Sequence, residues 1–192
     1  WGGLGTYDKI YKIMYHPSIP NLVFAGTSEG IYRSEDNFES FTRISVGNFS
    51  ELTYNFDFIE FHPTDQNIIY ASTMNNDSRI YISMNAGQNF SYSGNISGNN
   101  SNIKLSVSQA CENCIYVGTS DGIWKSDNMG QTFSLVGNPG LPNYGAFAVS
   151  DTNPNYMLFG DIDTHMSTDG GQTWNKTTYW SIGNSTYDTT GQ

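Results

Sequence analysis

The clearest stretch of this sequence reads Ser167-Thr168-Asp169-Gly170-Gly171-Gln172-Thr173-Trp174. It has the pattern Ser-x-Asp-x-Gly-x-Thr-Trp, and three weaker copies precede it, beginning at Ser34, Ser83 and Ser126. The first serines of the four copies are separated by 49, 43 and 41 residues. Internal repetition with a period in the forties is typical of propellers and solenoids. The chain therefore predicts a repeat architecture, in which a candidate functional residue is compared with its counterparts in the other copies.

Between the copies, each unit contains short apolar segments bounded by turn residues, which predicts strands rather than helices. Residues 67–73 align with residues 21–27, and residues 115–126 nearly repeat residues 22–34. Each unit offers four such strands, with the repeated pattern between the third and the fourth. We expect the first strand of each unit to line the centre with its least polar residues.

Four short strands per unit form the blade of a β-propeller. The predicted fold class is therefore all-β, with four-stranded antiparallel blades and no helix. The expected units cover residues 9–46, 54–93, 102–137 and 145–178 of a partial propeller that spans 1–192, and residues 179–192 are a linker or the start of a further blade.

The repeated pattern has to reverse the chain within a few residues. A short acid or amide at its third position accepts hydrogen bonds from turn N–H groups, and glycine supplies a positive φ. The final aromatic side chain returns to the core. The residues to which we assign this structural role are Ser34, Asp36 and Phe41; Ser83, Asn85, Gly87 and Phe90; Ser126, Asn128, Gly130 and Phe133; and Ser167, Asp169, Gly171 and Trp174. Because asparagine occupies the third position in two copies, that position needs a hydrogen-bonding side chain rather than a charge.

The four copies resemble the Asp-box, or bacterial neuraminidase repeat, of sialidases, sortilin-like receptors, xyloglucanases and many secreted bacterial surface proteins. The resemblance covers residues 9–177. It implies a parent propeller of about six to ten blades, which the rest of the same polypeptide would complete. It also places the boxes at the blade periphery, away from the central face that binds ligands, so the box acids are not expected to be catalytic.

Composition restricts the classes of partner. The chain has 8 Lys+Arg against 18 Asp+Glu, a net charge of −10, which disfavours binding to nucleic acid. No apolar run reaches the roughly 20 residues of a membrane span. The chain begins at Trp1 rather than Met, which favours a mature or partial segment of a longer protein. The Asp-box resemblance implies a secreted or cell-surface location.

Sialidase activity is disfavoured by the positions of the arginines. Sialidases use a cluster of three arginines, and this chain contains Arg33, Arg43 and Arg79. Arg33 leads directly into a box and Arg43 follows one, so both are expected at the periphery.

Xyloglucanase-like enzymes use two carboxylates, one as acid and one as base. The segment Gly160-Asp161-Ile162-Asp163 resembles the Gly-Asp element that carries one such acid, which makes Asp161 and Asp163 the candidate catalytic residues. Asp57 lies in a first strand, and no partner carboxylate can be matched by motif. The alternative is that both acids belong to a solvated loop.

Two further features concern metals and redox chemistry. Asp161 and Asp163 could bind calcium through oxygen ligands, and no other cofactor is expected. Cys111 and Cys114 form a Cys-x-x-Cys motif with strands on both sides, which favours a local disulfide or two quiet thiols over a redox centre. A zinc site would need two more ligands, and the neighbouring sequence offers none.

The first functional hypothesis is a non-catalytic propeller segment that presents a rigid face to a protein or glycan partner. The second is one half of a xyloglucanase-like glycoside hydrolase with Asp161 as a catalytic acid. The third is a sortilin-like receptor domain, although that family carries a cysteine-rich module which is not seen in this sequence.

Overall fold

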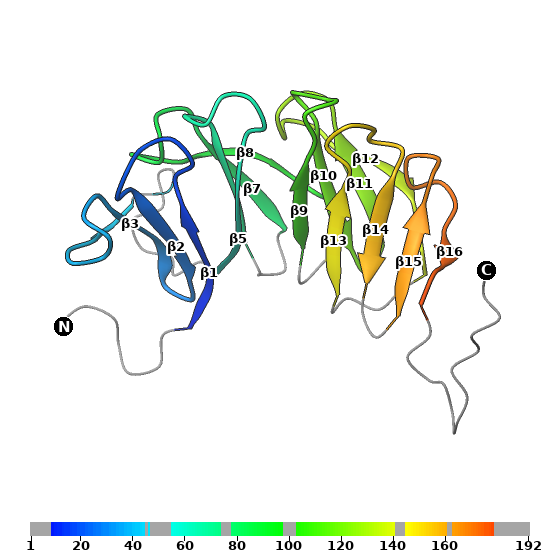
Figure 1. The fold of residues 1–192 in the computed structure, drawn as a ribbon, viewed down its shortest axis with the longest axis horizontal. Coiled ribbons are helices and arrows are strands. Elements are labelled where there is room, and N and C mark those ends of the chain that lie inside the picture. Colours follow the sequence, from blue (N-terminus) through cyan, green and yellow to red (C-terminus); the bar gives the residue numbers. More distant parts are fainter. Residues whose placement is uncertain are drawn as a thin grey trace, which may run out of the picture.

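The computed structural model describes residues 9–44, 46, 55–73, 78–97, 103–140, 145–160 and 163–178. Within these ranges the chain forms four antiparallel sheets of four strands each, and none of the described residues is helical. Figure 1 shows the four sheets side by side in an arc, in the order of the chain.

In every sheet the strands lie in chain order from the first to the fourth. The first sheet contains β1 (Ile10–Tyr15), β2 (Val23–Thr27), β3 (Gly30–Ser34) and β4 (Thr42–Arg43). The second contains β5 (Phe56–Phe61), β6 (Ile69–Thr73), β7 (Arg79–Ser83) and β8 (Ser91–Asn95). The third contains β9 (Lys104–Val107), β10 (Ile115–Thr119), β11 (Gly122–Ser126) and β12 (Ser134–Gly137). The fourth contains β13 (Ala146–Val149), β14 (Met157–Gly160), β15 (Thr164–Ser167) and β16 (Asn175–Lys176).

The first strands of neighbouring sheets contact one another, β1 with β5, β5 with β9 and β9 with β13. The first strands therefore lie at the inside of the arc, and each sheet extends outward from there. Consecutive antiparallel sheets arranged in this way are the blades of a propeller. The predicted fold class is confirmed: the chain is all-β and has the architecture of a propeller fragment.

The hydrophobic core lies between the sheets rather than within one of them. Every residue of β2, β6 and β10 is buried, because alternate side chains of a second strand face the two neighbouring sheets. Phe24 and Ile59 belong to the cluster between the first and second sheets, Tyr70 and Leu105 to the next, and Phe159 to the cluster in the third and fourth. A single sheet could not bury both of its faces, so the sheets stabilise one another.

The boxes make nearly the same hydrogen bonds in all four sheets. In the last box, the buried Ser167 hydroxyl donates to Asp169 Oδ1 at 2.8 Å and accepts from the Gly171 N–H at 2.8 Å. Asp169 Oδ1 also accepts from the Thr173 N–H at 2.9 Å. Hydrogen bonds from Thr173 and Ser167 lower the Asp169 pKa to about 2. Asn128 accepts the equivalent bonds from Ser126 and Thr132, which requires an oxygen acceptor but no charge.

Each of the later boxes also packs against the preceding sheet. A Cβ on Gly87 would lie 2.2 Å from Cε1 of Phe24, a residue of the first sheet. A Cβ on Gly137, in the third sheet, would lie 2.0 Å from the carbonyl oxygen of Gly171 in the last box. The first box differs, because Phe38 occupies the glycine position with a φ of 68°. The boxes thus connect neighbouring sheets as well as neighbouring strands.

Candidate functional site

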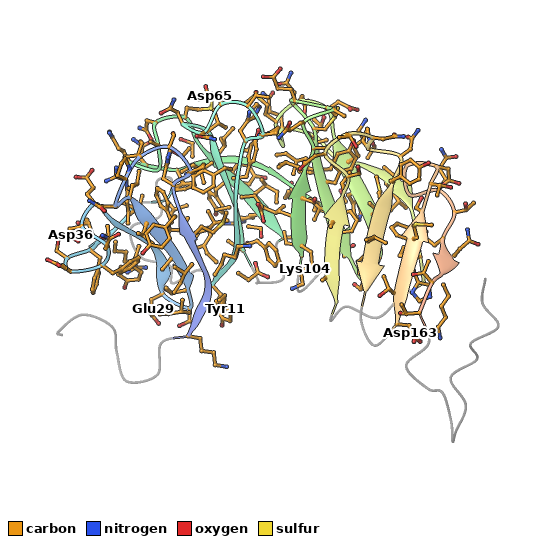
Figure 2. All side chains as sticks on the ribbon, viewed as in Figure 1. Tyr11, Glu29, Asp36, Asp65, Lys104 and Asp163 are labelled. Carbon is orange, nitrogen blue, oxygen red and sulfur yellow. A yellow bond between two sulfur atoms is a disulfide. The ribbon has the colours of Figure 1, made fainter. Side chains whose placement is uncertain are left out.

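The start of each first strand and the turn between each second and third strand lie at the same edge of the arc. Figure 2 shows Tyr11, Glu29, Lys104 and Asp163 at this edge, whereas Asp65 lies at the opposite edge. The sequence candidate Asp163 therefore shares an edge with residues of the first and third sheets. The boxes follow the third strands, so they lie away from this edge, as Asp36 does in the view.

Asp57 lies near the start of β5, at a register irregularity between Phe56 and Phe58. Such a bulge adds a residue to one strand and redirects its side chain. Asp57 is 4% exposed; its Oδ1 accepts a hydrogen bond from the Ser72 hydroxyl at 3.2 Å. Its Oδ2 is buried and has no hydrogen-bond partner among the described residues. An unsatisfied carboxylate oxygen in such a place is costly, and it marks a candidate functional group.

Burial raises the pKa of Asp57 to about 6, against the effects of the Lys104 ammonium and of several hydrogen bonds, which lower it. A carboxyl group with this pKa exchanges its proton near neutral pH, which is the property of a general acid in hydrolysis. The sequence predicts that Asp57 lies in a first strand and indicates no role for it. Its environment comes from β6 and β9, so no local motif could have identified it.

Charged side chains also lie between the first strands. Lys12, Phe58 and Lys104 occupy equivalent register positions in β1, β5 and β9. The Lys12 and Lys104 ammonium groups lie 5.4 Å and 4.9 Å from the centre of the Phe58 ring, within the range of cation–π contacts. Lys12 also pairs with Glu60 at 3.5 Å, and burial raises the Glu60 pKa. The expectation that the least polar residues line the centre is therefore wrong for these strands.

Asp163 precedes β15 and forms an ion pair with Lys176 of β16. Its side chain is 21% exposed. Asp161 lies outside the described residues. The catalytic and calcium roles of the two residues stay predictions.

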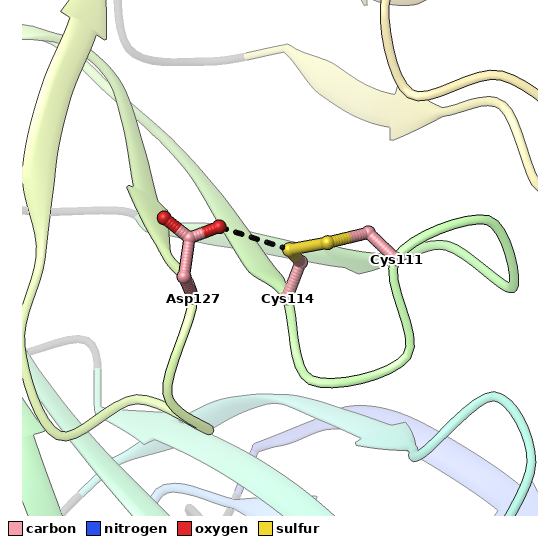
Figure 3. Close-up of side chains that lie close together, drawn as sticks. All are labelled: Cys111, Cys114 and Asp127. Atoms are coloured by element: carbon pink, nitrogen blue, oxygen red, sulfur yellow. Dashed lines mark hydrogen bonds between the residues drawn. A yellow bond between two sulfur atoms is a disulfide. The ribbon is translucent and has the colours of Figure 1, made fainter.

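A disulfide joins Cys111 and Cys114, in the loop before β10 (Figure 3). Cys114 Sγ lies 3.3 Å from Oδ1 of Asp127, which in turn pairs with Lys125 at 2.6 Å. Within the described ranges, one group of Cys, His, Asp or Glu side chains is compact enough to bind a metal ion, and it consists of Cys111, Cys114 and Asp127. No sequence motif identifies Asp127 as a neighbour of the cysteines, because the β10–β11 hairpin brings it to Cys114. With the sulfurs bonded to each other, the group offers no thiolate ligands.

The two His-Pro histidines stabilise turns. The Nδ1 atom of His16 accepts hydrogen bonds from the N–H groups of Ser18 and Ile19 at 3.2 Å and 3.0 Å. His62 Nδ1 does the same for Thr64 and Asp65. Burial lowers the pKa of both imidazoles, which favours their neutral form. The Nδ1 atom of each histidine already accepts these hydrogen bonds and is not free to bind a metal ion.

The comparisons with known proteins agree with this architecture. No protein-family model matches the chain. It is 28% identical over 154 residues to a xyloglucanase of Hypocrea jecorina (strain QM6a). The matched region covers 70% of this chain and 18% of that enzyme. The described residues contain no helix that could cross a membrane.

The solved structures with a similar fold include an ancestral GH74 enzyme and YCF48. An ancestral GH74 enzyme matches with a TM-score of 0.72 and 17% identity, over 88% of this chain and 25% of its own. YCF48 from Cyanidioschyzon merolae matches with a TM-score of 0.62 and 14% identity, over 91% of this chain and 57% of its own. At these identities the structures establish the β-propeller fold, and the chain spans a minor part of the xyloglucanase to which its sequence is related.

Proposed function

We propose that this chain is part of a xyloglucanase-like glycoside hydrolase and supplies one of its two catalytic carboxyl groups. The supporting observation is Asp57, a buried carboxyl group with an unpaired oxygen and a pKa of about 6, in a chain that is 28% identical to a xyloglucanase over 154 residues. The non-catalytic scaffold hypothesis, which came first from the sequence, has no comparable support. A secreted location follows from the proposed substrate, an extracellular polysaccharide.

In this proposal Asp57 is the general acid. Glycosidases of the two-carboxylate type protonate the leaving oxygen with one group while the other acts as base or nucleophile. A pKa of about 6 keeps a large share of Asp57 protonated in mildly acidic solution. The Lys104 ammonium stabilises the carboxylate that remains after the proton has left. Asp161 is the candidate from the sequence motif for the second carboxylate.

The four sheets are proposed as blades of a larger propeller that the rest of the polypeptide completes, with the boundaries expected from the sequence. The hydrogen-bond pattern from Ser167 to Thr173 supports the assignment of the repeats as Asp-boxes. Calcium at Asp161 and Asp163 stays a lesser possibility, because Lys176 already neutralises Asp163.

The test is the hydrolysis of xyloglucan by the intact protein, which is measured as the release of reducing ends. Asp57→Asn should lower kcat by about 100-fold or more, because the amide cannot donate the acid proton. The parent's pH profile should show a limb near pH 6 that the variant lacks. Asp161→Asn should also lower kcat strongly.

Asp121→Asn is the matched control. Asp121 is an exposed acid in the turn between β10 and β11, at the same edge of the arc. Its replacement should leave kcat unchanged. Full activity of Asp57→Asn with an unchanged pH profile would remove Asp57 from the mechanism, and a parent protein inactive on xyloglucan and related glucans would refute the proposed function itself.

A further inference from the structure

The second strands share a glycine that the second sheet replaces. Gly26, Gly118 and Gly160 pair with the first strand at the same register position in the first, third and fourth sheets. Ser72 takes this position in the second sheet, opposite Phe58. The repeat architecture does not require a serine here, so its side chain is a candidate for a role specific to the second sheet.

Packing against the following sheet explains two of these glycines. A Cβ on Gly26 would lie 2.6 Å from the carbonyl oxygen of Phe56, and a Cβ on Gly118 would lie 2.9 Å from Cε2 of Phe159. Ser72 carries a side chain at this position and is 0% exposed. Burial of a hydroxyl group is costly unless the group is hydrogen-bonded, so the partner of Ser72 shows what the serine does.

The Ser72 hydroxyl donates its hydrogen bond to Oδ1 of Asp57 at 3.2 Å. Asp57 is also a departure from the repeat, because the bulge at the same place in β1 presents Tyr11 instead. The second sheet therefore carries a carboxyl group and a hydroxyl group that the first sheet lacks at these positions, and the two groups bond to each other.

The described strands that contact β5 are β1, β2, β6 and β9, and they differ in the charged groups that they bring to Asp57. Burial raises the Asp57 pKa, and the Lys104 ammonium group of β9 opposes this shift. Lys12 of β1 pairs with Glu60 of β5 at 3.5 Å. β2 has no charged residue, and the titratable residue of β6 is Tyr70. Ser72 is thus the neutral hydrogen-bond donor to Asp57, beside the cationic Lys104.

We propose that Ser72 is a positioning residue for Asp57, because its hydroxyl group orients the carboxyl group and stabilises the carboxylate that remains after proton donation. This role rests on the proposed function, in which Asp57 is the general acid. Oδ1 is held by Ser72, so Oδ2, which has no partner among the described residues, is the oxygen that carries the acid proton. Ser72 acts through Asp57 and not on the substrate.

The test compares Ser72→Ala with the parent in the intact protein. Alanine removes the hydroxyl group and keeps the Cβ that this position already accommodates. In xyloglucan hydrolysis, the limb of the pH profile near pH 6 should move up by about one pH unit, because the carboxylate loses a hydrogen bond that stabilises its charge. KM should stay within about twofold of the parent value, since the hydroxyl group does not bind substrate.

Urea unfolding of the same proteins gives a readout that does not depend on activity. Ser72→Ala should reduce the folding equilibrium constant by a factor about tenfold larger at pH 8 than at pH 4, because a hydrogen bond to an ionised carboxyl group is the stronger one. Ser72→Gly restores the residue of the other three sheets, and it should show the same pH dependence.

Ser108→Ala is the matched control. Ser108 is also 0% exposed, and its hydroxyl group donates to the Ser150 carbonyl oxygen at 2.7 Å, at the opposite end of β9 from Lys104. Its loss should reduce stability equally at both pH values and leave the pH profile unchanged. The positioning role is overturned if Ser72→Ala behaves in the same way. A parent that is inactive on xyloglucan would instead refute the proposed function, and the unfolding comparison would then decide by itself whether Ser72 stabilises the carboxylate.

Discussion

Asp57 is 4% exposed, and burial raises the pKa of its carboxyl group to about 6. One of its oxygens accepts a hydrogen bond from Ser72, while the other is buried with no partner among the described residues. The group is therefore expected to reduce the stability of the fold whenever it is ionised. A functional group is often retained at such a cost, because the environment that destabilises the ion also raises its pKa.

The free energy of unfolding should depend on pH through this carboxyl group. The Asp57 pKa is about 6 in the folded chain against 3.8 for an unperturbed aspartate, so the folded state binds more protons between these values. Stability from this group is thus fully present below pH 3.8 and is lost as the pH rises through about 6. The loss is about 3 kcal/mol. Asp57→Asn should therefore stabilise the chain at pH 7 and bring little gain at pH 4.

Urea unfolding of parent and variant at both pH values measures this difference. Comparison at the same pH removes the effects of other titrating groups, including His16 and His62, whose lowered pKa values destabilise the fold as the pH falls below 6.5. An equal change in the free energy of unfolding at the two pH values would contradict the assigned pKa.

At the scale of the elements, the boxes have two structural roles. Their serine and their acid or amide close the turn between the third and fourth strands by hydrogen bonds within a few residues. Their glycine allows close approach to the preceding sheet, as at Gly87 and Phe24. The second role explains the strength of the glycine preference: a positive φ alone can be adopted by another residue, as Phe38 shows with a φ of 68°.

Gly87→Ala should separate these two requirements. The added Cβ would meet the Phe24 ring at 2.2 Å, and the φ of 72° disfavours alanine. Together the two effects should cost about 2–4 kcal/mol of unfolding free energy. Gly140→Ala is the control, since Gly140 has a φ of 68° and no atom within 4 Å of the added Cβ. It should cost about 1 kcal/mol. Equal costs in urea unfolding would show that backbone conformation alone requires the glycine.

At the scale of the whole molecule, the arc ends in two open apolar faces. Their side chains occupy the same register positions as buried core residues, and they are exposed because no sheet packs against them in the described part of the chain. Sheets with two apolar faces depend on neighbours for stability, and repeat proteins share this property. The faces at Tyr15 and Leu158 should therefore contribute to stability once they are covered.

Much of the fold was predictable because its information is local. The boxes recur as a pattern, and the side chains of their serine and their third residue bond to groups at most four positions away, as Ser167 does to Gly171. Strand alternation and turn residues then predict four-stranded blades. The candidate site was not predictable in the same way. The Gly-Asp motif directed attention to Asp161 and Asp163, whereas the structure singles out Asp57 by its burial and its unpaired oxygen.

The sequence by itself determined the repeat, the strand order within a unit and the turn chemistry, because each depends on residues close together in the chain. Tertiary structure alone decided the rest. The pKa of Asp57 depends on Ser72 from the next strand and Lys104 from the next sheet. Tyr15 and Phe61 occupy equivalent positions in similar strands, yet one is 63% and the other 9% exposed. Among the described residues a neighbouring sheet packs against Phe61 and none packs against Tyr15, a difference that no local pattern encodes.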